Sequence, residues 1–144
     1  MKQLLSLFLL TCIISAGAYC QPDTGFAAQR KLIDAQTLAT DSNKALTQNL
    51  LNGDLLWGKF QANCYFTYPA KAVAKTEYFF ENKAAGKKTF YYSNDNLVKI
   101  NDNGVIYYYL NRLFDKDGRP VNRSKEEELL FFSQESKKLV AQVF

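Results

Sequence analysis

Carboxylates are the side chains that could do chemistry in this chain, because its 144 residues include no histidine. Without histidine there is no Ser-His or Cys-His nucleophile pair and no histidine general base. Hydrolysis of a glycosidic bond needs two carboxyls held on opposite sides of the bond. Glu77 and Glu81 lie at an even spacing in a strand-like run, so they share a face but lie far apart. We therefore predict that the protein has no catalytic residues and is not an enzyme.

One acidic motif has the spacing of part of a calcium loop, Asp115-x-Asp117-Gly118. A complete loop needs a ligand two residues before Asp115 and a glutamate at its twelfth position, where this sequence has Leu113 and Ser124. A β-turn is therefore the preferred interpretation. Few cysteines and no histidine also disfavour a structural zinc site. We expect neither a metal nor a cofactor.

Aromatic residues make up 15% of the chain and recur in pairs and triplets. They define five strand-like runs, which are Cys64–Tyr68, Thr76–Phe80, Thr89–Tyr92, Leu97–Ile100 and Val105–Leu110. Such bulky side chains suit a pleated surface. The turns between the runs are rich in Asn, Asp and Gly and are too short for crossover helices. The pattern predicts an antiparallel meander of about five strands.

Alternation along these strands puts rings on both faces of the sheet. Five strands make a sheet roughly 24 Å wide, and two helices about 10 Å across cover only one such face. We therefore expect exposed rings, and predict a binding or interaction module for a carbohydrate, a peptide or a partner protein. The candidate ligand-binding residues are Trp57, Tyr78, Tyr91, Tyr107 and Tyr109, with Lys99 as a polar neighbour.

The rings also have two purely structural interpretations. The sheet could curl around its own aromatics, or cross-strand ring pairs could simply stabilise it. Two further functions also stay open: a small carboxylate-dependent hydrolase in a concave sheet, and an architectural envelope subunit. A pocket with two carboxyls within about 10 Å favours the hydrolase. A shallow aromatic patch favours the binding module, and a stable oligomer favours the architectural subunit.

Several lysines interleave with the aromatic residues, which is one feature of nucleic-acid binding. They are Lys71, Lys75, Lys83, Lys87, Lys88 and Lys99. The net charge of +4 is too small for a strong phosphate footprint. Lysines also protect strand edges and hairpin tips from aggregation, and we prefer this interpretation. We expect no nucleic-acid partner.

Two helices are expected to flank the sheet, which makes the fold class α+β. The first spans residues 26–51, where small and apolar residues recur at spacings of three and four: Ala28, Leu32, Ala35, Ala39, Leu46 and Leu50. A weak point at residues 41–43 could divide it, and Asn52-Gly53 supplies a stop. The second follows a capping box in which Ser124 is the cap and Glu127 lies three residues later.

The first 18 residues have the pattern of a secretory signal peptide. A positive start is followed by an apolar run of about 11 residues and the small-residue exit Ala16-x-Ala18. We expect cleavage after Ala18, a single domain over residues 19–144, and a periplasmic or secreted protein without a transmembrane segment. Lipidation at Cys20 is the alternative. Export permits a Cys20–Cys64 disulfide, with two unpaired thiols as the other outcome.

The segment Phe90-Tyr91-Tyr92-Ser93-Asn94-Asp95-Asn96-Leu97-Val98-Lys99-Ile100 resembles a hairpin of small, uncharacterised exported proteins of Gram-negative bacteria. In those proteins an aromatic-rich strand precedes an Asn/Asp-Gly turn and a second strand, and here Asp95-Asn96 stands where glycine is usual. The resemblance covers residues 61–144 and implies an envelope location and a helix-flanked sheet, but no activity. A helix before a curved antiparallel sheet also looks like the cystatin or nuclear-transport-factor architecture, which is an analogy of fold alone.

Overall fold

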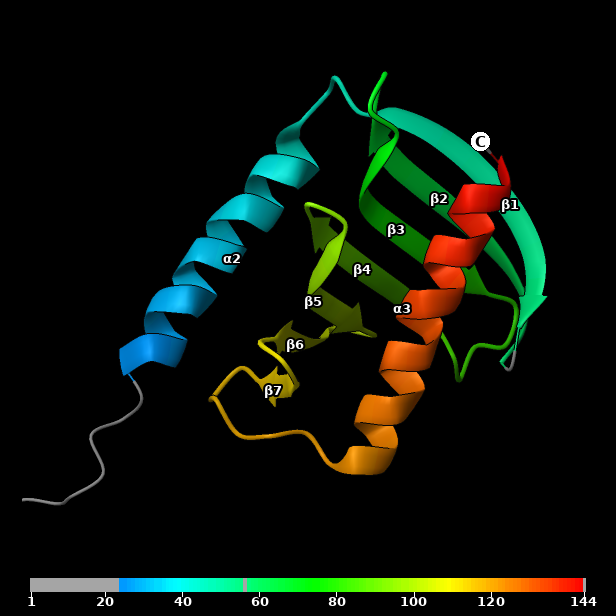
Figure 1. Ribbon diagram of the computed structural model, residues 1–144. Coiled ribbons are helices and arrows are strands. Elements are labelled where there is room, and N and C mark those ends of the chain that lie inside the picture. The colour runs from blue at the N-terminus through cyan, green and yellow to red at the C-terminus, as the bar shows by residue number, and fades with distance from the viewer. Residues whose placement is uncertain (1–23, 56, 144) are drawn as a thin grey trace, which may run out of the picture.

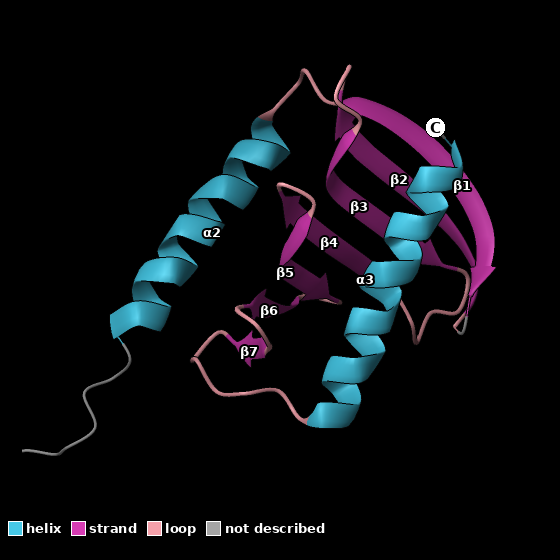
Figure 2. Cartoon of the chain, viewed as in Figure 1, coloured by secondary structure: helices cyan, strands magenta, loops and turns pink. Residues whose placement is uncertain are grey.

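A computed structural model describes residues 24–55 and 57–143, and shows two helices and a sheet of seven strands (Figures 1 and 2). The elements are α2 (Thr24–Ser42), β1 (Thr47–Leu55), β2 (Gly58–Thr67), β3 (Ala72–Phe80), β4 (Lys87–Ser93), β5 (Asn96–Asp102), β6 (Val105–Tyr109), β7 (Leu113–Asp115) and α3 (Arg123–Val143). The α+β class with helices at both ends is confirmed. The predicted signal peptide, residues 1–18, and Cys20 lie outside the described residues.

The strands form one antiparallel sheet in the order of the chain, from β1 to β7. Tight turns make this order possible, because residues such as Asn94 and Asp95 adopt positive φ angles of 49° and 61° between β4 and β5. The antiparallel meander is therefore confirmed. The expected number of about five strands is too low, because β1 and β7 were not anticipated.

The first helix ends at Ser42, so the prediction of a helix over residues 26–51 is wrong in its second half. The side chain of Asn43 accepts a hydrogen bond from the backbone N–H of Ala45 at 2.9 Å, which turns the chain out of the helix. Residues 47–55 then pair along their whole length with β2. Gly53, expected as a helix stop, lies inside β1, where an added Cβ would come within 2.6 Å of the Phe60 ring.

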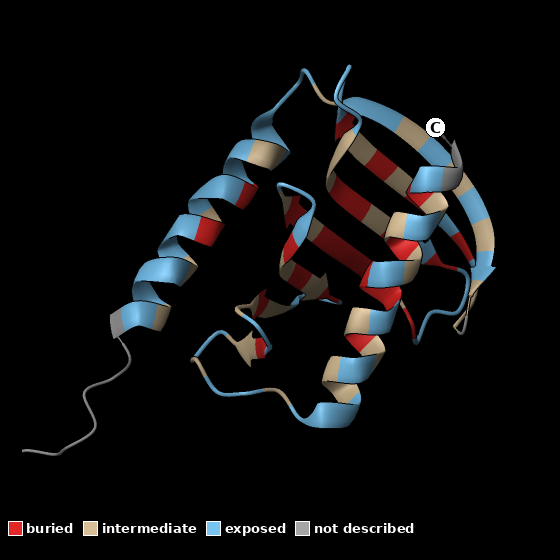
Figure 3. Ribbon diagram, viewed as in Figure 1, coloured by how far each residue is buried: buried red, intermediate tan, exposed pale blue. Residues whose placement is uncertain are grey.

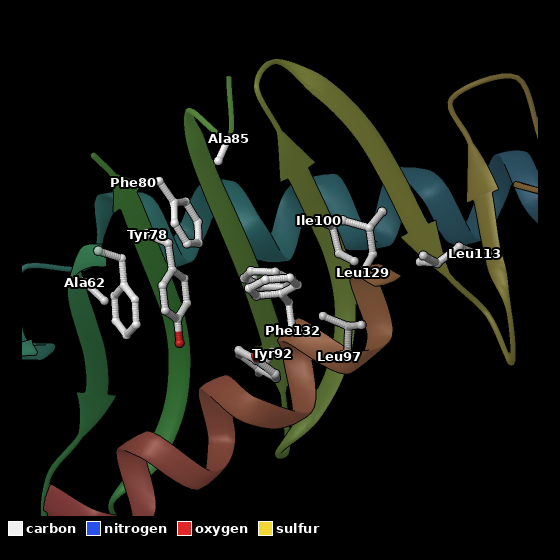
Figure 4. Close-up of a cluster of buried hydrophobic side chains, with 12 residues drawn as sticks. Ala62, Tyr78, Phe80, Ala85, Tyr92, Leu97, Ile100, Leu113, Leu129 and Phe132 are labelled. Atoms are coloured by element: carbon white, nitrogen blue, oxygen red, sulfur yellow. The ribbon is translucent and has the colours of Figure 1, made fainter. Parts of the chain in front are cut away.

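Each helix covers a different face of the sheet. We call the face against α3 the inner face and the face against α2 the outer face; the sheet curves around α3 (Figure 1). Figure 4 shows α3 in front of the strands and α2 behind them. Figure 3 marks buried residues on the ribbon of both the strands and α3. On the inner face a core of buried side chains forms between them (Figure 4): Phe60, Ala62, Tyr78, Phe80, Ala85, Phe90, Tyr92, Leu97, Ile100, Leu113, Leu129 and Phe132.

The outer face holds α2 through a stripe that the sequence pattern did not identify. The buried residues of α2 are Ile33 and Thr37, and Phe26 packs edge-on against Tyr108. The predicted stripe of alanines and Leu32 faces solvent instead, and Leu32 is 66% exposed. Two ion pairs add to these contacts, because Asp41 and Asp34 of α2 pair with Lys75 and Lys99 of the sheet.

The second helix begins slightly earlier than the capping box predicted. Asn122, rather than Ser124, caps it, because the Asn122 side-chain oxygen accepts a hydrogen bond from the N–H of Lys125 at 2.9 Å. Glu126 accepts another from the N–H of Leu113 at 2.6 Å, which ties the first turn of α3 to β7. Within the part of the chain that the structure describes, neither helix is long and apolar enough to cross a membrane.

Candidate functional site

The six predicted ligand-binding residues do not gather on one surface. Four lie on the inner face, and two, Tyr91 and Lys99, lie on the outer face. Of the inner four, Tyr78 is completely buried and Trp57 stacks on Phe132 of α3. The other two, Tyr107 and Tyr109, are half-buried against the same core. The inner rings therefore hold α3 on the sheet.

This division follows from the placement of the helices. We expected both helices on the same face, which would leave the opposite rings in solvent. With one helix on each face, most rings of both faces are covered at least in part. Among the described aromatic side chains, Tyr68 at 76%, Phe131 at 41% and Phe79 at 39% are the most exposed.

A groove of 620 Å³ lies on the outer face, between the C-terminal end of α2 and strands β3 to β5. This outer groove is lined by Asp41, Lys75, Glu77, Lys87, Thr89, Tyr91, Asn101, Asn103 and Gly104. The register of the sheet brings the strand residues together, because Lys75 lies opposite Tyr91 and Glu77 lies opposite Thr89. Its volume is in the range of small-ligand sites, and its walls are polar and charged.

Charges of alternating sign run through the outer groove. The Lys75 ammonium lies 2.9 Å from Asp41 Oδ1 and 3.6 Å from Glu77 Oε1, and Glu77 Oε1 lies 3.1 Å from Lys87 Nζ. The two inner members of this row of four charges, Lys75 and Glu77, have side chains only 11% and 15% exposed. The two end members are accessible to solvent, because the side chains of Asp41 and Lys87 are 42% and 50% exposed. The groove therefore offers an accessible carboxylate at one end and an accessible ammonium at the other.

Two tyrosine hydroxyls hold Asp41 and Glu77, the two carboxylates of this row of charges, in place. Tyr91 donates to Asp41, at 3.1 Å to Oδ2, and Tyr65 donates to Glu77 at 3.1 Å. Burial, together with the neighbouring carboxylate, raises the pKa of each tyrosine above its usual value. Both hydroxyls therefore remain protonated at neutral pH and act as hydrogen-bond donors.

Lys99, predicted as a polar neighbour of the rings, anchors α2. Its ammonium lies 2.7 Å from Asp34 Oδ1, and the Tyr108 hydroxyl donates to the same oxygen at 2.9 Å. Burial and the Asp34 carboxylate raise the pKa of Tyr108 to about 12. Lys99 lies 5.9 Å from the centre of the Tyr91 ring, so the anchor adjoins the outer groove.

The outer groove holds two carboxyls near each other, which is the arrangement that favours a hydrolase. Asp41 and Glu77 approach the same Lys75 nitrogen, so they lie well within the ~10 Å that catalysis by a carboxyl pair allows. A general acid needs a raised pKa. Burial acts in that direction on Glu77, but Lys87, Lys75 and Tyr65 outweigh it, and the pKa of Glu77 is lowered. Glu77 is thus held ionised, which suits recognition better than proton donation.

Lysines also occupy the faces of the aromatic rings on the outer face. Lys75 Nζ lies 4.4 Å from the centre of the Tyr65 ring, and Lys87 Nζ lies 5.0 Å from the centre of the Phe79 ring. These are cation–π distances. A sugar stacking on either ring would have to displace an ammonium group, so the geometry favours polar contacts with a ligand over ring stacking.

A second polar cluster, on the inner face, was not anticipated from the sequence. Asp102 contacts the ammonium groups of Lys88 and Lys125, and Lys88 Nζ lies 4.1 Å from the centre of the Trp57 ring. Burial opposes ionisation of Asp102, but hydrogen bonds from Lys125 and Lys88 outweigh it and lower its pKa. The adjoining hollow of 260 Å³ is smaller than the outer groove. We interpret this triad as a structural link between the sheet and α3.

The Asp115 motif forms a turn. The Asp115 side chain accepts hydrogen bonds from the N–H groups of Asp117 and Arg119, both at 2.9 Å, and pairs with the Arg119 guanidinium. In residues 24–55 and 57–143, no group of three or more Cys, Asp or Glu side chains could hold a metal ion. Cys64 is buried and has no disulfide partner among the described residues, and burial raises its pKa to about 11.

Comparison with known proteins adds no further constraint. No family model matches the chain, and no curated protein or solved structure resembles it closely enough to count as a relative. The function must therefore be inferred from the geometry of the outer groove.

Proposed function

We propose that the protein is an exported, non-catalytic binding module whose ligand site is the outer groove. The observation that most supports this proposal is that a solvent-accessible charged side chain lies at each end of the outer groove. Asp41 can receive a cationic group, and Lys87 can receive an anionic group. The ion pairs and hydroxyls between them are already ordered, which reduces the entropy lost when a ligand binds.

The ligand that best fits this pattern is a polar peptide segment carrying both charges. A peptide supplies backbone groups that can hydrogen-bond with the Thr89 hydroxyl and the Asn101 amide, and charged side chains for the two ends. A carbohydrate would depend more on free ring faces, and the neighbouring rings of Tyr65 and Phe79 are occupied by lysines. The signal-like residues 1–18 support a location outside the cytoplasm.

The test is binding of the mature chain, residues 19–144, to a peptide array and a glycan array. The best peptide is then measured by calorimetry with Lys87→Ala and with Lys83→Ala, an exposed lysine of the β3–β4 turn outside the outer groove. We expect Lys87→Ala to weaken binding at least tenfold and Lys83→Ala to leave it unchanged. Binding to glycans alone, or equal affinity of Lys87→Ala and wild type, would refute the peptide proposal.

The hydrolase remains the second candidate because Asp41 and Glu77 lie so close together. It is tested in the same experiment by mass spectrometry of the bound peptide or glycan after prolonged incubation. Intact ligand supports a binding module. Cleaved ligand, with cleavage abolished by Glu77→Gln, would establish the hydrolase instead.

A further inference from the structure

The outer edge of β1 is the longest unpaired strand edge of the described sheet. β1 pairs with β2 from Thr47 to Leu55, and no described residue pairs with its other side. In Figure 1 it is the outermost strand beside β2. An open edge presents a row of backbone donors and acceptors that can pair with another strand.

The direction of these backbone groups follows from one hydrogen bond. The carbonyl of Lys59 accepts from the N–H of Glu81, so the peptide groups of Lys59 point toward β3. The N–H and C=O groups of successive residues point to opposite sides of a strand, so those of Phe60 point toward β1. Gly53 is the partner of Phe60 in β1, and its N–H and C=O groups point back toward β2. The residues of β1 with N–H and C=O groups directed outward are therefore Gln48, Leu50, Asn52 and Asp54.

The opposite edge of the sheet is protected, and the edge of β1 is not. β7 has only three residues, and the following segment covers it: Val121 N–H donates to the Leu113 carbonyl at 3.0 Å, and Asp115 N–H donates to the Arg119 carbonyl at 2.9 Å. β1 has nine residues, with no proline, no lysine and no bulge against β2. Asp54 is its single charged residue. The devices that normally prevent edge pairing are thus present at β7 and, apart from the charge of Asp54, missing from β1.

We infer that β1 pairs with β1 of a second copy of this chain, antiparallel, about a two-fold axis through Leu51. This register uses the whole strand and pairs Leu50 with Asn52 of the second copy and Gln48 with Asp54. Every outward N–H and C=O group then has a partner. The outer groove lies on strands β3 to β5 and is not part of this interface, so the inference does not depend on the proposed function.

The side chains of β1 are compatible with this register. Leu51 meets its own copy on the inner face, where it already packs against the core. Leu50, 56% exposed on the outer face, gains its own copy as a diagonal neighbour. No two like charges lie opposite each other, because Asp54 faces Gln48. If the second copy were shifted by two residues, so that Leu50 lay opposite its Asp54, Gln48 would lie opposite no residue of the partner's β1. The outward N–H and C=O groups of Gln48 would then be unpaired.

The first test is sedimentation equilibrium of the mature chain over a wide concentration range, with two leucine variants. Leu50→Lys places a charge at the edge, and Leu38→Lys makes the same change on α2, where Leu38 is 68% exposed. We expect a wild-type dimer, at least a tenfold higher dissociation constant for Leu50→Lys, and an unchanged constant for Leu38→Lys. A wild-type monomer at all concentrations, or equal weakening by both variants, would overturn the inference. Circular dichroism checks that both variants fold.

The second test fixes the register by cross-linking in a Cys20→Ser background. Leu51→Cys lies on the proposed axis at a non-hydrogen-bonded position, where opposed Cα atoms are about 4.5 Å apart and can form a disulfide. Gln48→Cys faces Asp54 rather than itself. We expect a covalent dimer from Leu51→Cys only, on oxidation without reductant. Cross-linking of Gln48→Cys instead, or of neither variant, would exclude this arrangement.

Discussion

The buried triad around Asp102 gives the sharpest test of how α3 is held on the sheet. Asp102 neutralises Lys88, whose side chain is only 4% exposed, and Lys125 of α3, which lies 2.8 Å from Asp102 Oδ2. Replacement of Asp102 by Asn keeps the shape of the side chain but removes its charge. The Lys88 ammonium is then left with the Trp57 ring as its main electrostatic partner.

The size of the effect follows from burial. Removal of one partner from a buried ion pair costs about 3–5 kcal/mol, because the other charge stays desolvated and uncompensated. Lys125 contributes less, because it is 28% exposed and also pairs with Glu128. We therefore expect Asp102→Asn to lower the free energy of unfolding by about 3 kcal/mol or more. Adding Lys88→Met removes the buried charge, and should restore at least half of the loss.

The assay is urea unfolding followed by the fluorescence of Trp57, the chain's single tryptophan. The matched control is Glu127→Gln, which breaks an exposed ion pair with Arg123 and should cost under about 0.5 kcal/mol. If Asp102→Asn stayed within about 1 kcal/mol of wild type, or if Lys88→Met made it worse, the triad would not act as described.

The same triad predicts the behaviour of the protein in acid. The folded-state pKa of Asp102 is lowered, because the hydrogen bonds from Lys125 and Lys88 outweigh the effect of burial. Its stabilising contribution is thus complete above the unfolded pKa of about 3.9 and is lost as the pH falls through the lower, folded pKa. Asp102→Asn should make the loss of stability in that acidic range shallower. An unchanged slope would contradict the assignment.

Two further predictions concern the inner core. Phe132→Ala should lower the free energy of unfolding by about 3–5 kcal/mol, because the ring is buried against Trp57 and Phe80. Phe131 precedes it and is 41% exposed, so Phe131→Ala should cost under about 1 kcal/mol. Equal losses of stability in thermal melts would mean that α3 presents a different face to the sheet. Cys64, with its pKa raised to about 11 by burial, should resist iodoacetamide at pH 8 in the folded protein and react in urea without reductant. A requirement for reductant would reveal a disulfide instead.

The strands were predictable from the sequence because their signal is local. Each aromatic run overlaps an observed strand, and the turns between the runs, such as Asn94-Asp95, have the positive φ angles that tight hairpins need. The strand β1 was missed because Leu46 and Leu50 continue a helical spacing by chance. Pairing with β2 decides the structure of that segment, and it depends on contacts that no local pattern contains.

The candidate site was only partly predictable. Tyr91 does line the outer groove and Lys99 adjoins it, but the other predicted rings belong to the inner face. The sequence does hold one signal for the groove: Lys75 and Glu77 lie two residues apart in one strand, so their side chains share a face of the sheet. Asp41 had no such signal, because only the docking of α2 brings it to these strands.

The way in which α2 docks links the stability of the outer face to the shape of its groove. Phe26 and Ile33 make apolar contacts between α2 and the sheet, and two ion pairs, Asp34 with Lys99 and Asp41 with Lys75, add to them. Asp41 is at the same time a wall of the outer groove and one of its two accessible charges. The carboxylate that fixes the helix end is therefore the one that a cationic ligand group would contact. A helix docked by apolar side chains alone would bring no charge to the sheet, whereas α2, docked partly through carboxylates, places a charge at the surface that it covers.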